Sequence, residues 1–456
     1  MTNASLVGMP LELLVHLIAT YLPTKDLGAL RLTNRYLEKA LFDTFAKEFF
    51  TKKQFMCTTA SLQTLVNISK HEALKKFLKH CIVGLESYDA TRHNPAANDV
   101  QRKAFRHGLA DQFALMSSGR GRDLLATAFR HLPNLETVGI RDYEANGRER
   151  DGSRWRSYGV PTVFRETSCN LGSGSSQFAS KIFLLLMQAL ADAERTIQVP
   201  CIEIILRKHG NGLNDLAFFL SKDPKMDKVL DGLQQLLLTM NLDAEWTHTE
   251  LPGPTMMGAF LHRANSLQHV RLNFADQRGD VLKSSSFVLQ NLCTQSNLLP
   301  NLRCLELGML SVKPEILVQI ISKFSATIRH VSLWKVVLAQ DTADRWKDEA
   351  SIYRYHPWPR VLRDLSMATQ LTSMTVGCLS QWNTSKHGPL TKIHFSNNDV
   401  SRKYSGNIKE WLPKLLGELE VEWPSDDDED SDQSETEYDG EDSDASVYEN
   451  GSMGGE

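Results

Sequence analysis

The chain has 456 residues, of which 41% are hydrophobic and 23% charged, a composition typical of a soluble protein with one large or two moderate cores. Its charge is uneven, because Ser425–Glu456 holds 14 of the 55 acidic residues and no basic one, which leaves an excess of basic residues elsewhere. Those Lys and Arg residues are dispersed, which argues against a nucleic-acid interface, and no apolar stretch reaches the roughly 20 residues of a membrane span.

The seven cysteines are scattered, odd in number and never spaced as CxxC. This pattern predicts reduced, mostly buried thiols in a cytoplasmic or nuclear protein, and it indicates neither a disulfide framework nor a zinc site. They are Cys57, Cys81, Cys169, Cys201, Cys293, Cys304 and Cys378.

The first 50 residues predict three short helices with a dense apolar surface. Pro10 lies in the first turn of a helix that ends before Pro23, and Thr24 and Thr33 are placed to cap the next two. A unit of roughly 40 residues is too small to bury this surface alone, so the excess must cover a partner or the rest of the chain.

The order of residues in these helices carries a family resemblance: Met9-Pro10, Glu12-Leu13-Leu14, Ile18, Tyr21-Leu22-Pro23, Asp26-Leu27, Leu30-Arg31-Leu32 and Arg35. It resembles the F-box, by which a receptor binds the Skp-family adaptor of a cullin ubiquitin ligase. Met9 replaces the common Leu, and Tyr36-Leu37 replaces the common Trp after Arg35. The resemblance implies an adaptor-binding surface made of Met9, Pro10, Leu11, Leu14, Ile18, Leu22, Leu27, Leu30 and Leu32.

The next segments predict a helix from Ser61, a helix over Glu72 to Lys79 and a strand over Cys81 to Leu85. Phe105 to Phe129 follows a helical spacing that is interrupted near Ser117 to Gly121. The predicted order at the start of this region is helix, helix, strand.

From residue 135 an apolar helix, a polar turn and an apolar L-x-x-L-x-L triplet recur. The triplets are Leu135/Val138/Ile140, Val199/Ile202/Ile204, Leu233/Leu236/Leu238, Leu267/Val270/Leu272, Leu302/Leu305/Leu307, Ile328/Val331/Leu333, Leu371/Met374/Val376 and Leu390/Ile393/Phe395. Those from Val199 to Leu302 are spaced by 34 or 35 residues. Stacked units of one helix and one strand predict a curved α/β solenoid with a parallel sheet. This resembles the irregular leucine-rich repeats that often follow an F-box, although an ordinary α/β domain is an alternative.

These patterns divide the chain into an F-box at 1–52, a repeat-like domain at 53–424 and a disordered acidic tail at 425–456. Two insertions, Tyr143 to Ser176 and the aromatic Ala339 to Pro359, interrupt the repeat-like domain. The tail carries acidophilic kinase patterns at Ser425, Ser434 and Thr436.

One face of the predicted sheet presents a mixed polar surface, since alternate strand residues share a face. Its expected members are His269, Arg271, Asn273, Cys304, Glu306, Gly308, His330, Ser332, Trp334, Ser373, Thr375, Gly377, Lys392, His394 and Ser396. We expect this face to bind a target protein through His269, Arg271, His330, Trp334 and His394. Trp334 and Arg271 are the expected anchors, because aromatic and Arg side chains dominate many interfaces.

His269, Cys304 and His330 could form a row on that face, but no carboxylate that would orient them is evident. No phosphate loop, nucleophile elbow, HExxH or paired-carboxylate motif occurs in the chain. We therefore predict no catalytic residue, no metal and no cofactor.

The sequence thus predicts a noncatalytic substrate receptor of a Skp-cullin-F-box ubiquitin ligase, located in the cytoplasm, the nucleus or both. Its expected partners are the Skp-family adaptor with its cullin ligase core and an unknown protein substrate, but neither nucleic acid nor a membrane. The alternatives are a ligase-independent repeat scaffold and an unrecognised α/β enzyme.

Overall fold

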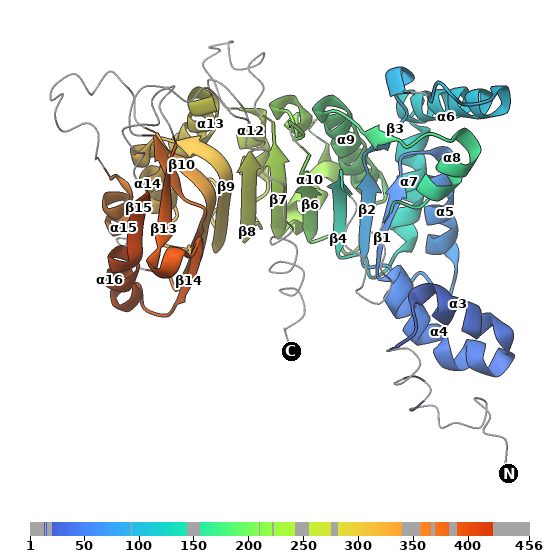
Figure 1. Ribbon diagram of the computed structural model, residues 1–456, viewed down its shortest axis with the longest axis horizontal. Coiled ribbons are helices and arrows are strands. Elements are labelled where there is room, and N and C mark those ends of the chain that lie inside the picture. Colours follow the sequence, from blue (N-terminus) through green and yellow to red (C-terminus); the bar gives the residue numbers. More distant parts are fainter. Residues whose placement is uncertain are drawn as a thin grey trace.

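The computed structural model describes residues 21–92, 94–143, 156–208, 210–220, 223–241, 255–274, 281–339, 356–365, 370–382 and 390–422, together with Leu13 and Val15 (Figure 1). The predicted acidic tail and most of the second insertion lie outside these residues. So do five of the expected adaptor-binding residues, Met9, Pro10, Leu11, Leu14 and Ile18.

The second and third predicted helices are α3 (Thr24–Thr33) and α4 (Arg35–Phe50), which lie beside one end of the sheet (Figure 1). Their caps differ from the prediction by one residue: Pro23 precedes α3, and the Asn34 side chain caps α4 by accepting a hydrogen bond from the Tyr36 amide at 2.7 Å. Asn34 takes this place because its short side chain reaches the second amide of α4.

A mostly parallel sheet of 13 strands, with helices between its strands, follows α4 and confirms the α/β class; β3 (Glu86–Ser87) and β5 (Gly172–Ser173) form a separate small sheet. Its parallel strands follow one another in chain order, each in register with the next. They are β1 (Lys52–Met56), β2 (His80–Gly84), β4 (Thr137–Arg141), β6 (Cys201–Ile205), β7 (Gln235–Met240), β8 (His269–Phe274), β9 (Cys304–Val312) and β10 (His330–Leu338). Six of these eight strands, β4 and β6–β10, coincide with predicted apolar triplets.

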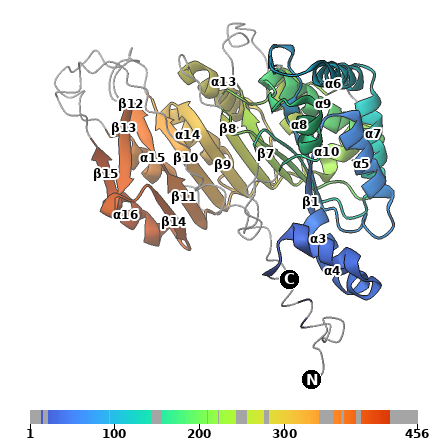
Figure 2. The same cartoon turned by 45° about the vertical axis from the view of Figure 1, so that its right-hand side comes forward.

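Helices cover one face of this sheet (Figures 1 and 2). They are α5 (Thr59–Lys70), α7 (Arg120–His131), α9 (Ser176–Asp192), α10 (Pro224–Gly232), α12 (Met256–Arg263), α13 (Val281–Thr294), α14 (Pro314–Lys323) and α15 (Trp358–Leu365). Right-handed crossovers between parallel neighbours in chain order place every connecting helix on the same side. Along β8, Val270, Leu272 and Phe274 are accordingly buried while the alternate residues are half-exposed. We call the face opposite the helices the open face.

Two local predictions have clear outcomes. The break near Ser117 to Gly121 is confirmed, because α6 (Asp99–Ser117) ends there and Gly119 adopts a φ of 79° before α7. The prediction of a helix over Glu72 to Lys79 is wrong, because residues 72–77 form turns. The Lys79 and His80 amides both donate hydrogen bonds to the Thr51 carbonyl, just before β1. The chain between α5 and β2 therefore already pairs with the start of β1 at Lys79.

A kink crosses the C-terminal part of the sheet at Met309, Lys335 and Cys378, which all have φ near 50°. Met309 and Lys335 follow the paired residues Gly308 and Trp334, so β9 and β10 bend together. The kink divides the edge of β10, which pairs with β11 (Ser373–Gly377) before it and with β12 (Ser380–Trp382) after it.

β11 and β12 still run parallel to β10, but beyond them the sheet becomes antiparallel, which the predicted solenoid did not include. β13 (Leu390–Phe395) pairs with β12 and with β15 (Leu419–Glu422), whereas β14 (Ser401–Ser405) pairs with β11. Only residues 396–400 link β13 to β14, whereas α16 (Ile408–Glu418) lies between β14 and β15. Antiparallel pairing, unlike parallel pairing, does not require a crossover helix.

Two separate apolar clusters stabilise the described chain. The main core lies between the sheet and its helices, from Phe55 to Leu415. The smaller one joins Leu27, Leu37 and Leu41 of α3 and α4. Among the described helices, none is long and apolar enough to cross a membrane.

Candidate functional site

The open face carries polar side chains in rows that run across β8 to β11. The register confirms the predicted rows: His269, Cys304, His330 and Ser373; Arg271, Glu306, Ser332 and Thr375; and Asn273, Gly308, Trp334 and Gly377. Neighbouring strands lie about 4.8 Å apart, so adjacent side chains within a row can touch.

The three residues expected at the end of these rows lie elsewhere. Lys392 and His394 are on β13, which does not pair with β11, and Ser396 follows it. His394 is instead hydrogen-bonded to Glu422 of β15, with 2.8 Å between Nε2 and Oε2. The antiparallel β14 takes the expected position beside β11 and brings Ser405, Lys403 and Ser401 to the rows.

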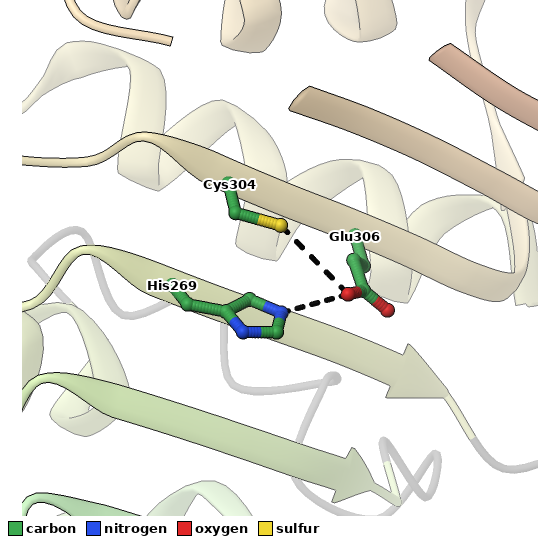
Figure 3. A group of neighbouring side chains, drawn as sticks. All are labelled: His269, Cys304 and Glu306. Carbon is green, nitrogen blue, oxygen red and sulfur yellow. Dashed lines mark hydrogen bonds and ion pairs between the residues drawn. The ribbon is translucent and has the colours of Figure 1, made fainter. Parts of the chain in front are cut away.

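A compact polar cluster lies on β8 and β9 (Figure 3). His269 Nε2 is 2.7 Å from Glu306 Oε1, and the Cys304 thiol donates to the same oxygen at 3.8 Å. Arg271 Nη1 is 3.9 Å from the other oxygen, Oε2. The single carboxylate of Glu306 therefore organises the cluster.

Glu306 corrects the expectation that no carboxylate orients this row. It is in register with Arg271, yet its side chain reaches diagonally to His269 in the neighbouring row. A row-by-row interpretation of the sequence misses such diagonal contacts, although Glu306 was placed on the correct face.

The electrostatics of the cluster follow from burial and close contacts. Burial favours a neutral Glu306, but its hydrogen bond with His269 and the nearby basic groups outweigh burial and hold its pKa below the usual range. Burial, followed by the Glu306 charge, raises the pKa of the Cys304 thiol far above its usual range. Cys304 is therefore a thiol at neutral pH and not a nucleophilic thiolate.

A second cluster on the open face was missed by the sequence analysis. Arg141 of β4 binds Glu203 of β6 through Nη2 at 2.5 Å and Nε at 3.2 Å, and His80 Nε2 lies 3.9 Å from the same carboxylate oxygen. Burial lowers the pKa of His80 to about 3, whereas His80 and Arg141 together overcome burial and lower that of Glu203 to about 2. The signal for this cluster was present, because Cys201-Ile202-Glu203 repeats the spacing of Cys304-Leu305-Glu306.

The two expected anchors are both held against the sheet. Arg271 keeps only 12% of its side chain exposed beside Glu306. The Trp334 indole lies over Gly377, where an added Cβ would be 2.2 Å from its ring. His330 is fixed by Ser373, with 2.7 Å between Nδ1 and Oγ. The central rows therefore form a preorganised surface whose side chains have little freedom.

All seven cysteines are described and none forms a disulfide bond. Only Cys57, Cys81 and Cys169 are buried and the other four are partly exposed, so the prediction that most of the thiols are buried is wrong. Cys201 and Cys304 remain partly exposed because both point to the open face.

The described adaptor-binding candidates have different environments. Leu22 and Leu30 are partly buried against the α3–α4 cluster, and Leu27 is completely buried in it. A partner therefore cannot contact Leu27 directly, which corrects its expected role to one inside the cluster. Leu32 is 75% exposed.

Other apolar side chains of the N-terminal unit are also exposed, among them Tyr21 at 75%, Leu13 at 47% and Tyr36 at 42%. We call Leu13, Tyr21, Leu32 and Tyr36 the N-terminal apolar surface. All four belong to the segment that precedes β1, and an exposed apolar residue by itself is common.

The chain matches no model of a known protein family and no curated protein. The resemblance to the F-box therefore rests on the sequence from Met9 to Arg35 alone.

Proposed function

We propose that this chain is a noncatalytic substrate receptor of a Skp-cullin-F-box ubiquitin ligase. In this proposal, the N-terminal helices form an F-box that binds the adaptor, and the sheet is an irregular leucine-rich-repeat-like solenoid that binds a target protein. The parallel strands lie side by side in the order in which they occur in the sequence, and their helices cover one face. This supports a solenoid, because the strand order of a doubly wound fold changes direction within the sheet and its helices cover both faces.

The main support is the N-terminal apolar surface on a unit with its own small core. The cluster of Leu27, Leu37 and Leu41 does not join the main core, so α3 and α4 can hold their positions without using this surface. Tyr21 and Leu32, each 75% exposed, remain for a partner. Covering an exposed apolar side chain of this size contributes about 1.5–3 kcal/mol before the costs of association.

The unit is attached to the body through side chains of α4. The rings of Phe42 and Phe77 meet edge to face with centroids 6.5 Å apart, and Lys76 Nζ lies 3.7 Å from Asp43 Oδ1. Lys53 of β1 places its ammonium 3.2 Å from the centre of the Phe49 ring. None of these three contacts uses Leu13, Tyr21, Leu32 or Tyr36.

The open face supports the second half of the proposal. Its rows combine basic, acidic, aromatic and hydroxyl side chains on rigid strands, which suits recognition of a protein surface. A receptor needs no catalytic group of its own, since holding a target lysine near a charged thioester raises the effective concentration of the reactants.

The test is adaptor binding by a Tyr21→Asp/Leu32→Asp variant of the full chain. A purified Skp-family adaptor should bind the wild-type chain and lose at least about 2 kcal/mol of binding energy, roughly 30-fold in affinity, with the variant. The matched control is Phe113→Asp, which changes a 73% exposed aromatic residue on α6 and should bind the adaptor normally.

Calorimetry measures both affinities, and hydrogen exchange verifies that α3 and α4 stay folded in the variant. Equal adaptor affinity of a folded Tyr21→Asp/Leu32→Asp variant would refute the docking surface. Absence of any adaptor binding by the wild-type chain would favour the ligase-independent scaffold.

A further inference from the structure

The cluster on β8 and β9 has the donor set of a metal site. His269 and Cys304 are register partners, and Glu306 lies two residues beyond Cys304 on the same face. An imidazole nitrogen, a thiolate sulfur and a carboxylate oxygen are the three ligand types that proteins use for Zn²⁺. The ligand atoms of these three residues all lie within 4.8 Å of one another.

The distances are close to those of a tetrahedral zinc shell. Zn–ligand bonds of 2.0–2.3 Å separate the ligand atoms by roughly 3.3–3.8 Å. Cys304 Sγ and Glu306 Oε1 are already 3.8 Å apart. His269 Nε2 and Glu306 Oε1, now hydrogen-bonded at 2.7 Å, would separate by about half an ångström when a metal replaces the shared proton.

The surroundings hold the ligands in place. All three belong to paired strands, which position side chains more firmly than loops do. Glu306 is only 8% exposed, and Arg271 lies 3.9 Å from its second oxygen, which leaves Oε1 directed at His269 and Cys304. His269 keeps 26% of its side chain exposed, so the site is accessible from the open face.

The chain contains a matched site that lacks this capacity. Cys201 and Glu203 of β6 have the same spacing as Cys304 and Glu306, and His80 lies near Glu203. There the guanidinium of Arg141 occupies the carboxylate, with Nη2 at 2.5 Å and Nε at 3.2 Å. A cation would have to displace this fixed positive charge, which makes binding unfavourable.

We propose that His269, Cys304 and Glu306 bind one Zn²⁺ ion, with the fourth position directed toward the open face. The Cys304 thiol releases its proton to solvent as the Zn–S bond forms. Water or a side chain of a bound protein completes the coordination. The ion links β8 to β9 at the centre of the open face. This proposal does not depend on adaptor binding, because the site is on the sheet and not on the N-terminal unit.

The test is titration of the reduced full chain with Co²⁺, followed by Zn²⁺. One equivalent of Co²⁺ should produce a thiolate-to-cobalt charge-transfer band with the strong visible bands of four-coordinate cobalt, and Zn²⁺ should remove both. Zn²⁺ should also raise the melting temperature of the chain.

The variants separate this site from other cysteines and histidines. Cys304→Ser should abolish the charge-transfer band, and His269→Gln should weaken Zn²⁺ binding more than about 100-fold, since even residues that only support metal ligands cost 10–100-fold. Cys201→Ser is the matched control and should keep the band and the affinity. Circular dichroism shows whether each variant is folded.

Two results would overturn the proposal. One is a wild-type chain without a charge-transfer band at equimolar Co²⁺, which would leave His269 and Glu306 as a purely structural hydrogen-bonded pair. The other is a band that persists in folded Cys304→Ser, because the thiolate ligand would then belong to another cysteine.

Discussion

Replacement of Leu41 by Ala is expected to unfold the N-terminal helices while the sheet remains folded. Leu41 is completely buried in the small cluster with Leu27 and Leu37, and that cluster is separate from the main core. A fully buried Leu→Ala change costs about 2.7–5 kcal/mol. A unit of about 40 residues has only roughly 2–6 kcal/mol of stability by itself. The substitution therefore removes most or all of the stability of the N-terminal unit.

Hydrogen exchange measured by mass spectrometry resolves the two regions. In Leu41→Ala, peptides from α3 and α4 should lose protection, whereas peptides from β6 to β10 should exchange as in the wild type. Leu32→Ala is the control, because a 75% exposed side chain contributes within about 0.5 kcal/mol. An adaptor at 100 times its dissociation constant should restore about 2.7 kcal/mol of protection.

A loss of protection that extends equally through β6 to β10 would refute this reasoning. The two clusters would then unfold as one cooperative unit, and the N-terminal helices would be an integral part of the body. Unchanged protection of α3 and α4 would also contradict it. The free-energy cost of the cavity would then be smaller than the free energy that stabilises these helices.

Three further predictions concern the sheet. Acidification from pH 7.5 to 5.5 should destabilise the chain, because the folded state lowers the pKa of His80 to about 3 and only the unfolded state gains a proton below about pH 6.5. Urea unfolding at the two pH values measures this loss of stability, which should be about 1 kcal/mol smaller in His80→Gln than in the wild type. Gly377→Ala should displace the Trp334 indole and cost about 1–3 kcal/mol, and the same change in a Trp334→Ala background should cost less. Trp358→Ala should cost about 3–5 kcal/mol in the same assay, because Trp358 is completely buried and donates to the Ser380 carbonyl at 3.0 Å.

Local patterns determined the regular elements of this protein. The triplets at Leu135, Val199, Leu233, Leu267, Leu302, Ile328, Leu371 and Leu390 all lie in or lead into strands of the sheet. Their alternation needs only one covered face, which the preceding apolar helix supplies within the same unit. The open-face residues from His269 to Gly377 followed from the same period of two.

Pairings between distant segments were decided only by the tertiary structure. A strand pattern is the same for parallel and antiparallel pairing, so the sequence alone could not place His394 beside Glu422. Likewise, the spacing of apolar and polar residues assigns each residue to a face of the sheet but does not predict a diagonal contact. The contact between the Glu306 carboxylate and His269 depends on the register of β8 and β9. The sequence by itself therefore determined which residues share a face, because that depends on neighbours along the chain. Which of them touch depended on strand order and direction, because these are set by the packing of the whole sheet.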